Sequence, residues 1–198
     1  MKHYFLLLLL IGCIASGHAE SGWKAHWINT ERCQSETNTW LAFRKTVHID
    51  KVPQTLTARI AADSKYWLWI NGELVVREGG LKRGPNPKDT YCDILRDVKG
   101  LVSGRNTIAL LVWYFGKDGF SHRNSPTAGV SVDLTIGKQR YISDDSWKVS
   151  IHPSFYIPNG INPNYRLPES NIGFNAQKEV AFWDKDFYKQ AAALADIV

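Results

Sequence analysis

Carboxylates and histidines are the side chains that most often exchange protons in enzymes, and this sequence has 19 acidic residues and six histidines. A hydrolase that uses two carboxyl groups needs them on opposite sides of the bond it cleaves, and no acidic residue stands in a motif that marks such a pair. We expect Asp63, at the start of a strand-like run, to accept hydrogen bonds from the backbone N–H groups that follow it. The histidines lack metal-ligand spacing, and no nucleophile elbow or phosphate-binding glycine loop is present. The sequence therefore predicts no catalytic residue, no metal and no cofactor.

Aromatic residues give the stronger functional signal. The chain has eight Trp, and indole rings stack on the apolar faces of sugars while nearby polar groups bind the hydroxyls. One region combines both kinds of side chain, at Trp113, Tyr114, Lys117, Asp118 and Phe120. Arg83 and Asp89, in a long loop rich in glycine and proline, can flank it. We predict that these residues bind a carbohydrate; plain solvation of the loops and contact with another domain are the competing interpretations.

A second aromatic group lies in the alternating run before Asn71. Side chains alternate across a strand, so Trp67 and Trp69 share one face while Tyr66, Leu68 and Ile70 occupy the other. One face must enter the core. The Trp67/Trp69 face is predicted either to pack against a neighbouring layer or to form a sugar-binding or docking surface.

The elements that would position these residues are short strands. The pair Asn71-Gly72 suits a two-residue turn with positive φ at both positions, which predicts a hairpin over 61–76. The run 107–115 is apolar on both faces, as in a central strand between two packed layers. Alternating patterns predict further strands at 40–49, 55–62, 90–95, 130–136, 139–142 and 147–151. Many short strands separated by turns indicate an all-β, jelly-roll β-sandwich.

The first nineteen residues have the layout of a secretory signal peptide. A charged start precedes the apolar run 5–14, and small residues precede a cut after Ala19, which predicts an exported protein, periplasmic or secreted. Leu10 to Cys13 also resembles a lipoprotein processing box; lipidation of Cys13 would instead tether the protein to the outer membrane. We divide the rest into a β-sandwich at 20–152 and an extended Pro- and Asn-rich closing segment at 153–198.

The charge of the chain bears on its binding partners, and its cysteines bear on a possible disulfide. The formal net charge is +5 and the basic residues are dispersed, so no nucleic-acid footprint is expected. Without lipidation we expect no membrane contact. Cys33 and Cys92 either form a disulfide or stay free thiols, because their separation in sequence does not fix their distance in space.

Four segments in series carry a family resemblance. They read W-x-A-x-W-I at 23–28, A-D-x-x-Y running to N-G at 62–72, N-x-I followed by W-Y-x-G at 106–116, and G-F-N-A followed by a tryptophan at 173–183. In this order they resemble the β-sandwich domain that precedes the catalytic barrel in bacterial α-L-rhamnosidases. Asn175 and Gln177 depart from the pattern, because an acid and an arginine are usual there.

The resemblance implies a galactose-binding-like sandwich with no catalytic residues of its own. The catalytic carboxyl groups would lie in a barrel that this sequence does not include, so we expect a fragment or truncated form of an exported α-L-rhamnosidase-type enzyme. Its expected partner is a rhamnose-containing glycan or the absent barrel. Three alternatives stay open, namely a hydrolase subunit completed by a separate barrel, a docking module that binds no sugar, and a β-galactosidase-type sandwich domain.

Overall fold

The computed structural model describes residues 23–30, 36–53, 56–81, 92–120, 122–159, 169–180 and 183–184. Its elements follow one another as β1 (Thr39–Ile49), β2 (Leu56–Asp63), β3 (Lys65–Ile70), β4 (Glu73–Gly80), β5 (Asp93–Arg96), β6 (Gly104–Tyr114), β7 (Gly129–Ile136), β8 (Gln139–Ile142), β9 (Lys148–Ile151), β10 (Phe155–Tyr156), β11 (Gly173–Phe174) and the 3-10 turn η2 (Ala176–Lys178). The predicted strands are present, with shifted ends at several of them.

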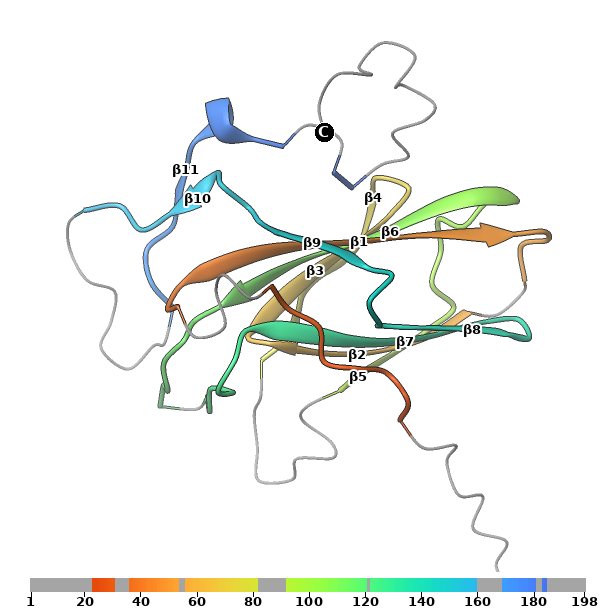
Figure 1. Ribbon diagram of the computed structural model, residues 1–198, viewed down its shortest axis with the longest axis horizontal. Helices are drawn as coiled ribbons and strands as arrows, with labels where there is room; N and C mark the ends of the chain where they lie inside the picture. Colours follow the sequence, from red (N-terminus) through yellow and green to blue (C-terminus); the bar gives the residue numbers. More distant parts are fainter. Residues whose placement is uncertain are drawn as a thin grey trace, which may run out of the picture.

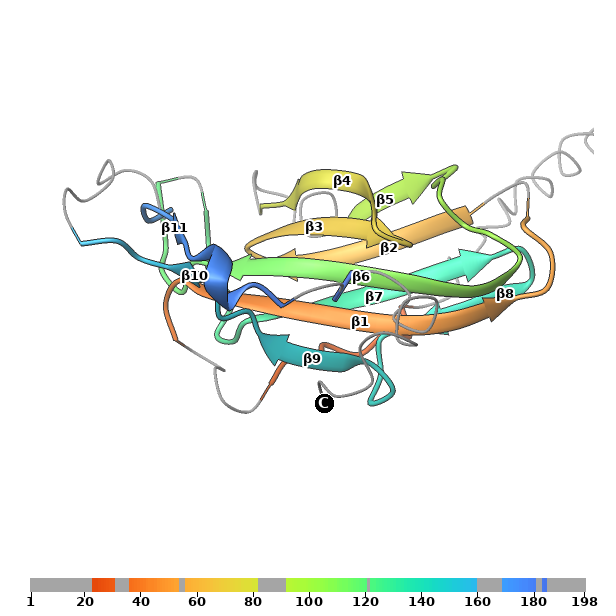
Figure 2. The ribbon, with the colours of Figure 1, turned by 90° about the horizontal axis from the view of Figure 1, so that it is seen from above.

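Two antiparallel sheets form the body of the protein. A five-stranded sheet has the order β4-β3-β6-β1-β9, and a four-stranded sheet has the order β5-β2-β7-β8. Figure 1 shows them as an upper and a lower layer, and Figure 2 shows the strand order across the five-stranded sheet. The structure confirms the predicted all-β, jelly-roll β-sandwich.

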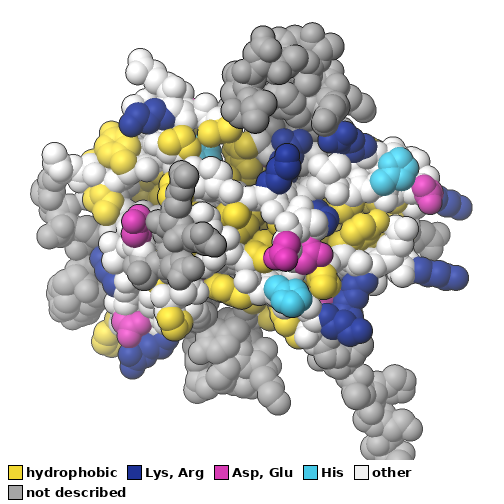
Figure 3. All heavy atoms as spheres, in the orientation of Figure 1, with side chains coloured by type: hydrophobic (Ala, Val, Ile, Leu, Met, Phe, Trp, Pro, Cys, Tyr) yellow, Lys and Arg dark blue, Asp and Glu magenta, His cyan; other side chains and the backbone are white. Residues whose placement is uncertain are grey.

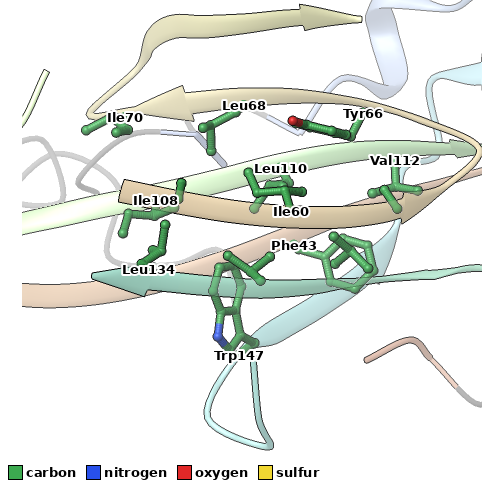
Figure 4. Close-up of a cluster of buried hydrophobic side chains, with 14 of the residues drawn as sticks. Phe43, Ile60, Tyr66, Leu68, Ile70, Ile108, Leu110, Val112, Leu134 and Trp147 are labelled. Carbon is green, nitrogen blue, oxygen red and sulfur yellow. The ribbon is translucent and has the colours of Figure 1, made fainter. Parts of the chain in front are cut away.

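The core lies between the two sheets and follows the alternation in the sequence. Tyr66, Leu68 and Ile70 of β3 are buried against Ile60 of β2 and Leu134 of β7 in one hydrophobic cluster. Figure 4 shows these side chains pointing into the space between the layers. Burial of each such side chain stabilises the fold by roughly 1.5–3 kcal/mol, which explains why the strand register follows the apolar pattern.

The turn between β3 and β4 has the predicted conformation. Asn71 has φ 54° and Gly72 has φ 82°, as a type I′ turn requires. The Asn71 side chain also accepts a hydrogen bond from the Thr107 backbone N–H at 2.8 Å and donates to Asn106 Oδ1 at 2.9 Å. The turn is thereby fixed to the start of β6.

The hairpin itself begins later than predicted. Residues 61–63 belong to β2 in the four-stranded sheet, and the hairpin comprises β3 and β4 in the other sheet. At the crossing, the Ser64 backbone N–H donates to Trp113 O at 2.9 Å, and the Ser64 hydroxyl accepts from the Phe115 N–H at 3.1 Å. The sequence conceals this change of sheet, because every even-numbered residue from 56 to 70 is buried, and the apolar ones face the same core from both layers.

The described part of the closing segment lies on the outer side of the five-stranded sheet, away from the four-stranded one (Figure 1). Its described residues form the two-residue strands β10 and β11, which pair with each other, and then η2. The division of the chain at residues 19 and 152 stays a prediction. Cys13, Cys33, Arg83 and Asp89 lie outside the described residues; Cys92 is a half-buried free thiol.

Candidate functional site

The loop between β6 and β7 is the candidate site, and its start depends on a glycine. Gly116 has φ 69°, and a Cβ at this position would lie 2.6 Å from Thr37 Cα. Asp118 then closes the loop on itself, because its carboxylate accepts the Asn124 backbone N–H and an Arg123 guanidinium N–H, each at 2.8 Å. These two bonds, the Asn124 bond first, hold the pKa of Asp118 below its usual range.

Buried polar groups hold the base of the loop. Tyr114 Oη donates to Ser125 O at 2.8 Å and accepts from Asn124 Nδ2 at 2.8 Å. Burial raises the pKa of Tyr114. Asp63 has no exposed surface, and its Oδ2 accepts the Ser125 backbone N–H. His122 Nε2 lies 3.6 Å from Asp63 Oδ1.

Asp63 is therefore structural, as predicted, but its partner is different from the one expected. It binds a backbone N–H from 62 residues further along the chain, where the sequence predicted local N–H groups. Its position at the end of β2 explains the difference, because the loop after β6 passes over that strand end.

The tip of this anchored loop is open to solvent. The Phe120 side chain is 89% exposed, and Lys117, Asp118 and Arg123 are exposed beside it. On the face drawn in Figure 3, hydrophobic, basic and acidic side chains lie next to one another at the lower left, where Figure 1 draws this loop. An accessible aromatic face next to charged hydrogen-bonding groups is the chemistry that sugar rings require.

The five predicted site residues that the structure describes divide into two groups. Lys117, Asp118 and Phe120 lie together on the loop, so their binding role stays a prediction that the geometry allows. Trp113 and Tyr114 are only 4% and 1% exposed, on opposite faces of β6. Neither ring offers a face to a ligand, because strand alternation turns one into the core and the other into a second cluster.

This second cluster covers the outer face of the five-stranded sheet. Trp40, Leu111, Trp113 and Phe115 form its buried part. Trp40 stacks on Trp113 with ring centroids 4.8 Å apart and on Trp67 at 5.5 Å. Trp67 and Trp69 pack against this cluster and are half-buried. The prediction that their face packs against a neighbouring layer is therefore confirmed for the buried part of each side chain.

The closing segment completes this aromatic surface. Phe155 stacks on Trp40 at 4.1 Å, and the Trp183 ring meets Trp69 edge-on at 5.3 Å. Lys65 Nζ lies 3.3 Å from Glu169 Oε1 and 5.9 Å from the centre of the Trp113 ring. Sequence reasoning missed this surface, because its aromatic residues come from five separate stretches of the chain. The available signal was the pair Trp67 and Trp69 on alternate positions of β3.

Two of the buried or half-buried carboxylates outside the loop have structural partners. Asp93 accepts from Tyr66 Oη and from the Gly80 N–H, each at 2.8 Å. Asp133 pairs with Arg140. Within the described ranges, no group of three or more His, Cys, Asp or Glu side chains could hold a metal ion. In the same part of the chain no helix is long and apolar enough to cross a membrane.

A groove of about 480 Å³ lies between the edge strands β4 and β5. Its walls are mostly aliphatic, from Leu74, Val75, Val76, Ile94, Leu95 and Val98, with Glu73, Arg96, Asp97 and Lys99 at the same site. The lining contains no aromatic ring on which a sugar could stack. It is a weaker candidate than the loop after β6.

Comparison with known proteins gives a consistent relationship at the level of structure. No protein-family model matches the sequence, and no curated protein is similar to it at a significant level. A GH78 family rhamnosidase of Bacillus sp. GL1 superposes with a TM-score of 0.69 and 25% identity, over 84% of this chain and 18% of the other. The α-L-rhamnosidase of Aspergillus terreus gives 0.60 and 20% identity over 82% and 20% of the two chains.

The α-L-rhamnosidase of Dictyoglumus thermophilum superposes similarly, with a TM-score of 0.59 and 21% identity over 82% of this chain and 19% of that one. Each match covers most of this chain and no more than 20% of the rhamnosidase. The chain is therefore similar to a β-rich domain of α-L-rhamnosidases, one that lacks their catalytic barrel.

Proposed function

We propose that this chain is a non-catalytic, carbohydrate-binding accessory domain of an exported α-L-rhamnosidase-type glycoside hydrolase. The observation that carries the proposal is the superposition of 84% of the chain on 18% of a GH78 family rhamnosidase, at 25% identity. A domain that occupies this share of such an enzyme has a role beside the catalytic barrel. Its glycan ligand would contain rhamnose, the sugar that gives those enzymes their name.

The loop after β6 is the proposed binding site. Phe120 supplies the stacking face, and Lys117, Asp118 and Arg123 supply hydrogen bonds to sugar hydroxyls. Because Asp118 is already held by Arg123 and by the backbone, little side-chain freedom is lost when a ligand binds. This preorganisation favours binding over plain solvation of the loop.

Calorimetric titration with rhamnose-containing oligosaccharides tests the proposal. Phe120→Ala should weaken binding about tenfold, since half-burying one aromatic ring contributes roughly 1–1.5 kcal/mol. Phe174→Ala, which removes a 49% exposed ring from β11, is the matched control and should bind as the wild type does. No binding by the wild type, or equal losses in both variants, would contradict the sugar-binding role.

A second measurement separates the accessory role from catalysis. The purified chain should not release the aryl group from an aryl rhamnoside. Turnover that disappears when one of its own carboxylates, such as Asp118, is replaced would show that the chain is a hydrolase. Export is part of the proposal on the strength of the signal-like residues 1–19, and amino-terminal sequencing of the secreted protein would locate the cut.

The half-buried Trp67 and Trp69 support one other candidate function, a docking platform for a neighbouring domain. Aromatic rings are common in interface cores, and this surface already packs one segment of the chain. If this aromatic surface is the only functional surface, the protein would bind no glycan, and the calorimetric titration with rhamnose-containing oligosaccharides would detect no binding.

A further inference from the structure

Side-chain contacts, with little backbone pairing, hold the closing segment on the sandwich. We use the word cover for its described residues, 153–159, 169–180 and 183–184. Within the described part, backbone hydrogen bonds of the cover join β10 to β11 and Asn175 N to Ser154 O. The last described backbone bond to the sheet is the one before it, from His152 N to Trp40 O at 2.8 Å.

The described contacts that fix the cover are therefore mostly between side chains. They include the Phe155–Trp40 stack, the Trp183–Trp69 edge contact and the Lys65–Glu169 ion pair, together with contacts to His152. A segment with short strands and exposed surroundings opens at a lower free energy than the core sheets do. Its opening would uncover Trp40, which is now 4% exposed.

His152 lies at the joint between β9 and the cover. Its residue is 4% exposed, and its ring lies 5.0 Å from Phe155 and 5.9 Å from Trp183, centre to centre. Nδ1 accepts the Ser154 backbone N–H at 3.4 Å, so this nitrogen carries no proton in the closed arrangement. If Nδ1 takes up a proton, it becomes a donor that faces the Ser154 N–H donor, and the hydrogen bond between them is lost.

The elements around the ring offer little compensation for a positive charge. The two rings in contact with it, Phe155 of β10 and Trp183, are uncharged, and β1 contributes the Trp40 carbonyl oxygen, which accepts the His152 backbone N–H. Among the described residues, Glu179 is the charged group whose field acts on His152, and it favours the imidazolium. Burial is the larger effect, and the pKa of His152 is lowered.

We propose that the cover is released by acid: a proton on His152 breaks its contact with Ser154 and frees the cover from the outer aromatic face of the five-stranded sheet. This inference is independent of the sugar-binding role. Its physiological consequence would be an aromatic surface that becomes accessible as the surroundings acidify.

The direction of the effect follows from proton linkage. His152 is neutral in the closed form and has its ordinary pKa, about 6.5, once released. The released form thus binds more protons, so the cover is most stable above pH ~6.5 and weakens as the pH falls toward the closed-form pKa. With one proton involved, the ratio of open to closed molecules changes by at most about tenfold per pH unit.

Hydrogen exchange followed by mass spectrometry tests this on the full chain. After correction for intrinsic exchange rates, peptides that contain Ser154 and Phe174 should lose protection between about pH 7.5 and pH 5, while β6 peptides keep theirs. His152→Gln keeps an acceptor but cannot titrate, so its protection should be independent of pH. His48→Gln removes an exposed histidine on the same sheet and should leave the wild-type profile unchanged.

Wild-type protection that is equal at both pH values, or a His152→Gln profile that retains the wild-type slope, would overturn the proposal. If the cover of the His152→Gln variant is open at every pH, two measurements on the wild-type protein test the proposal instead. The midpoint of the NMR titration of the His152 ring must equal the midpoint of the loss of hydrogen-exchange protection. Different midpoints would refute the link between protonation and opening.

Discussion

Asp63 lies at the end of β2 with no exposed surface, beneath the loop that follows β6. Its Oδ2 accepts the Ser125 backbone N–H, and its Oδ1 lies 3.6 Å from His122 Nε2. Replacing Asp63 with alanine removes a hydrogen bond to a charged acceptor, a contribution of about 1.5–3 kcal/mol. It also takes the carboxylate away from the buried His122 ring and leaves a small void. We expect the free energy of unfolding to fall by about 3 kcal/mol in total.

The Asp63→Asn variant removes the negative charge and keeps the size and shape of the side chain. The amide oxygen can still accept the Ser125 N–H, so the loss should be about half that of Asp63→Ala. Urea denaturation at neutral pH, followed by circular dichroism, gives both values from the shift in midpoint. Asp50→Ala removes a carboxylate whose side chain is 89% exposed and serves as the control, with no measurable change expected.

Two results would refute the reasoning. A loss below about 1 kcal/mol for Asp63→Ala would mean that the buried carboxylate does not support the loop. Equal losses for the alanine and asparagine variants would mean that its charge contributes nothing. If Asp63→Ala alters the loop as proposed, it should also weaken glycan binding, because Phe120 would no longer be held in place.

Two further predictions concern the environment of Tyr66. Gly79→Ala would place a Cβ 2.4 Å from the Tyr66 ring, so we expect the free energy of unfolding, measured by urea denaturation, to fall by about 1–3 kcal/mol. The control Gly104→Ala, with nothing within 4 Å of the new Cβ, should lose only about 1 kcal/mol, because of its positive φ. Equal losses in the two variants would contradict this steric explanation. Burial and the bond to Asp93 raise the pKa of Tyr66, so its phenol should not ionise with the exposed tyrosines in an alkaline absorbance titration. The folded form then holds this proton more tightly than the unfolded form, and its stability should fall above pH ~10, less steeply in Tyr66→Phe.

Local patterns were enough to predict most of the fold. The alternation at 66–70 identified the core face of β3, and the Asn71-Gly72 pair identified the turn, because both depend on residues close in sequence. The two-sided apolar run of β6 correctly predicted the central strand of the larger sheet. The same reasoning placed the candidate site in the loop after β6, where Phe120 is exposed.

The sequence by itself thus determined which residues form strands and which face of β3 enters the core, because burial and turn geometry act over a few neighbouring residues. Only the tertiary structure decided that Trp113 is covered, that Asp63 binds Ser125 and that Trp183 packs on Trp69. Each of these contacts joins residues far apart in the chain. Their distances depend on sheet order and on the path of the closing segment, which no local pattern specifies.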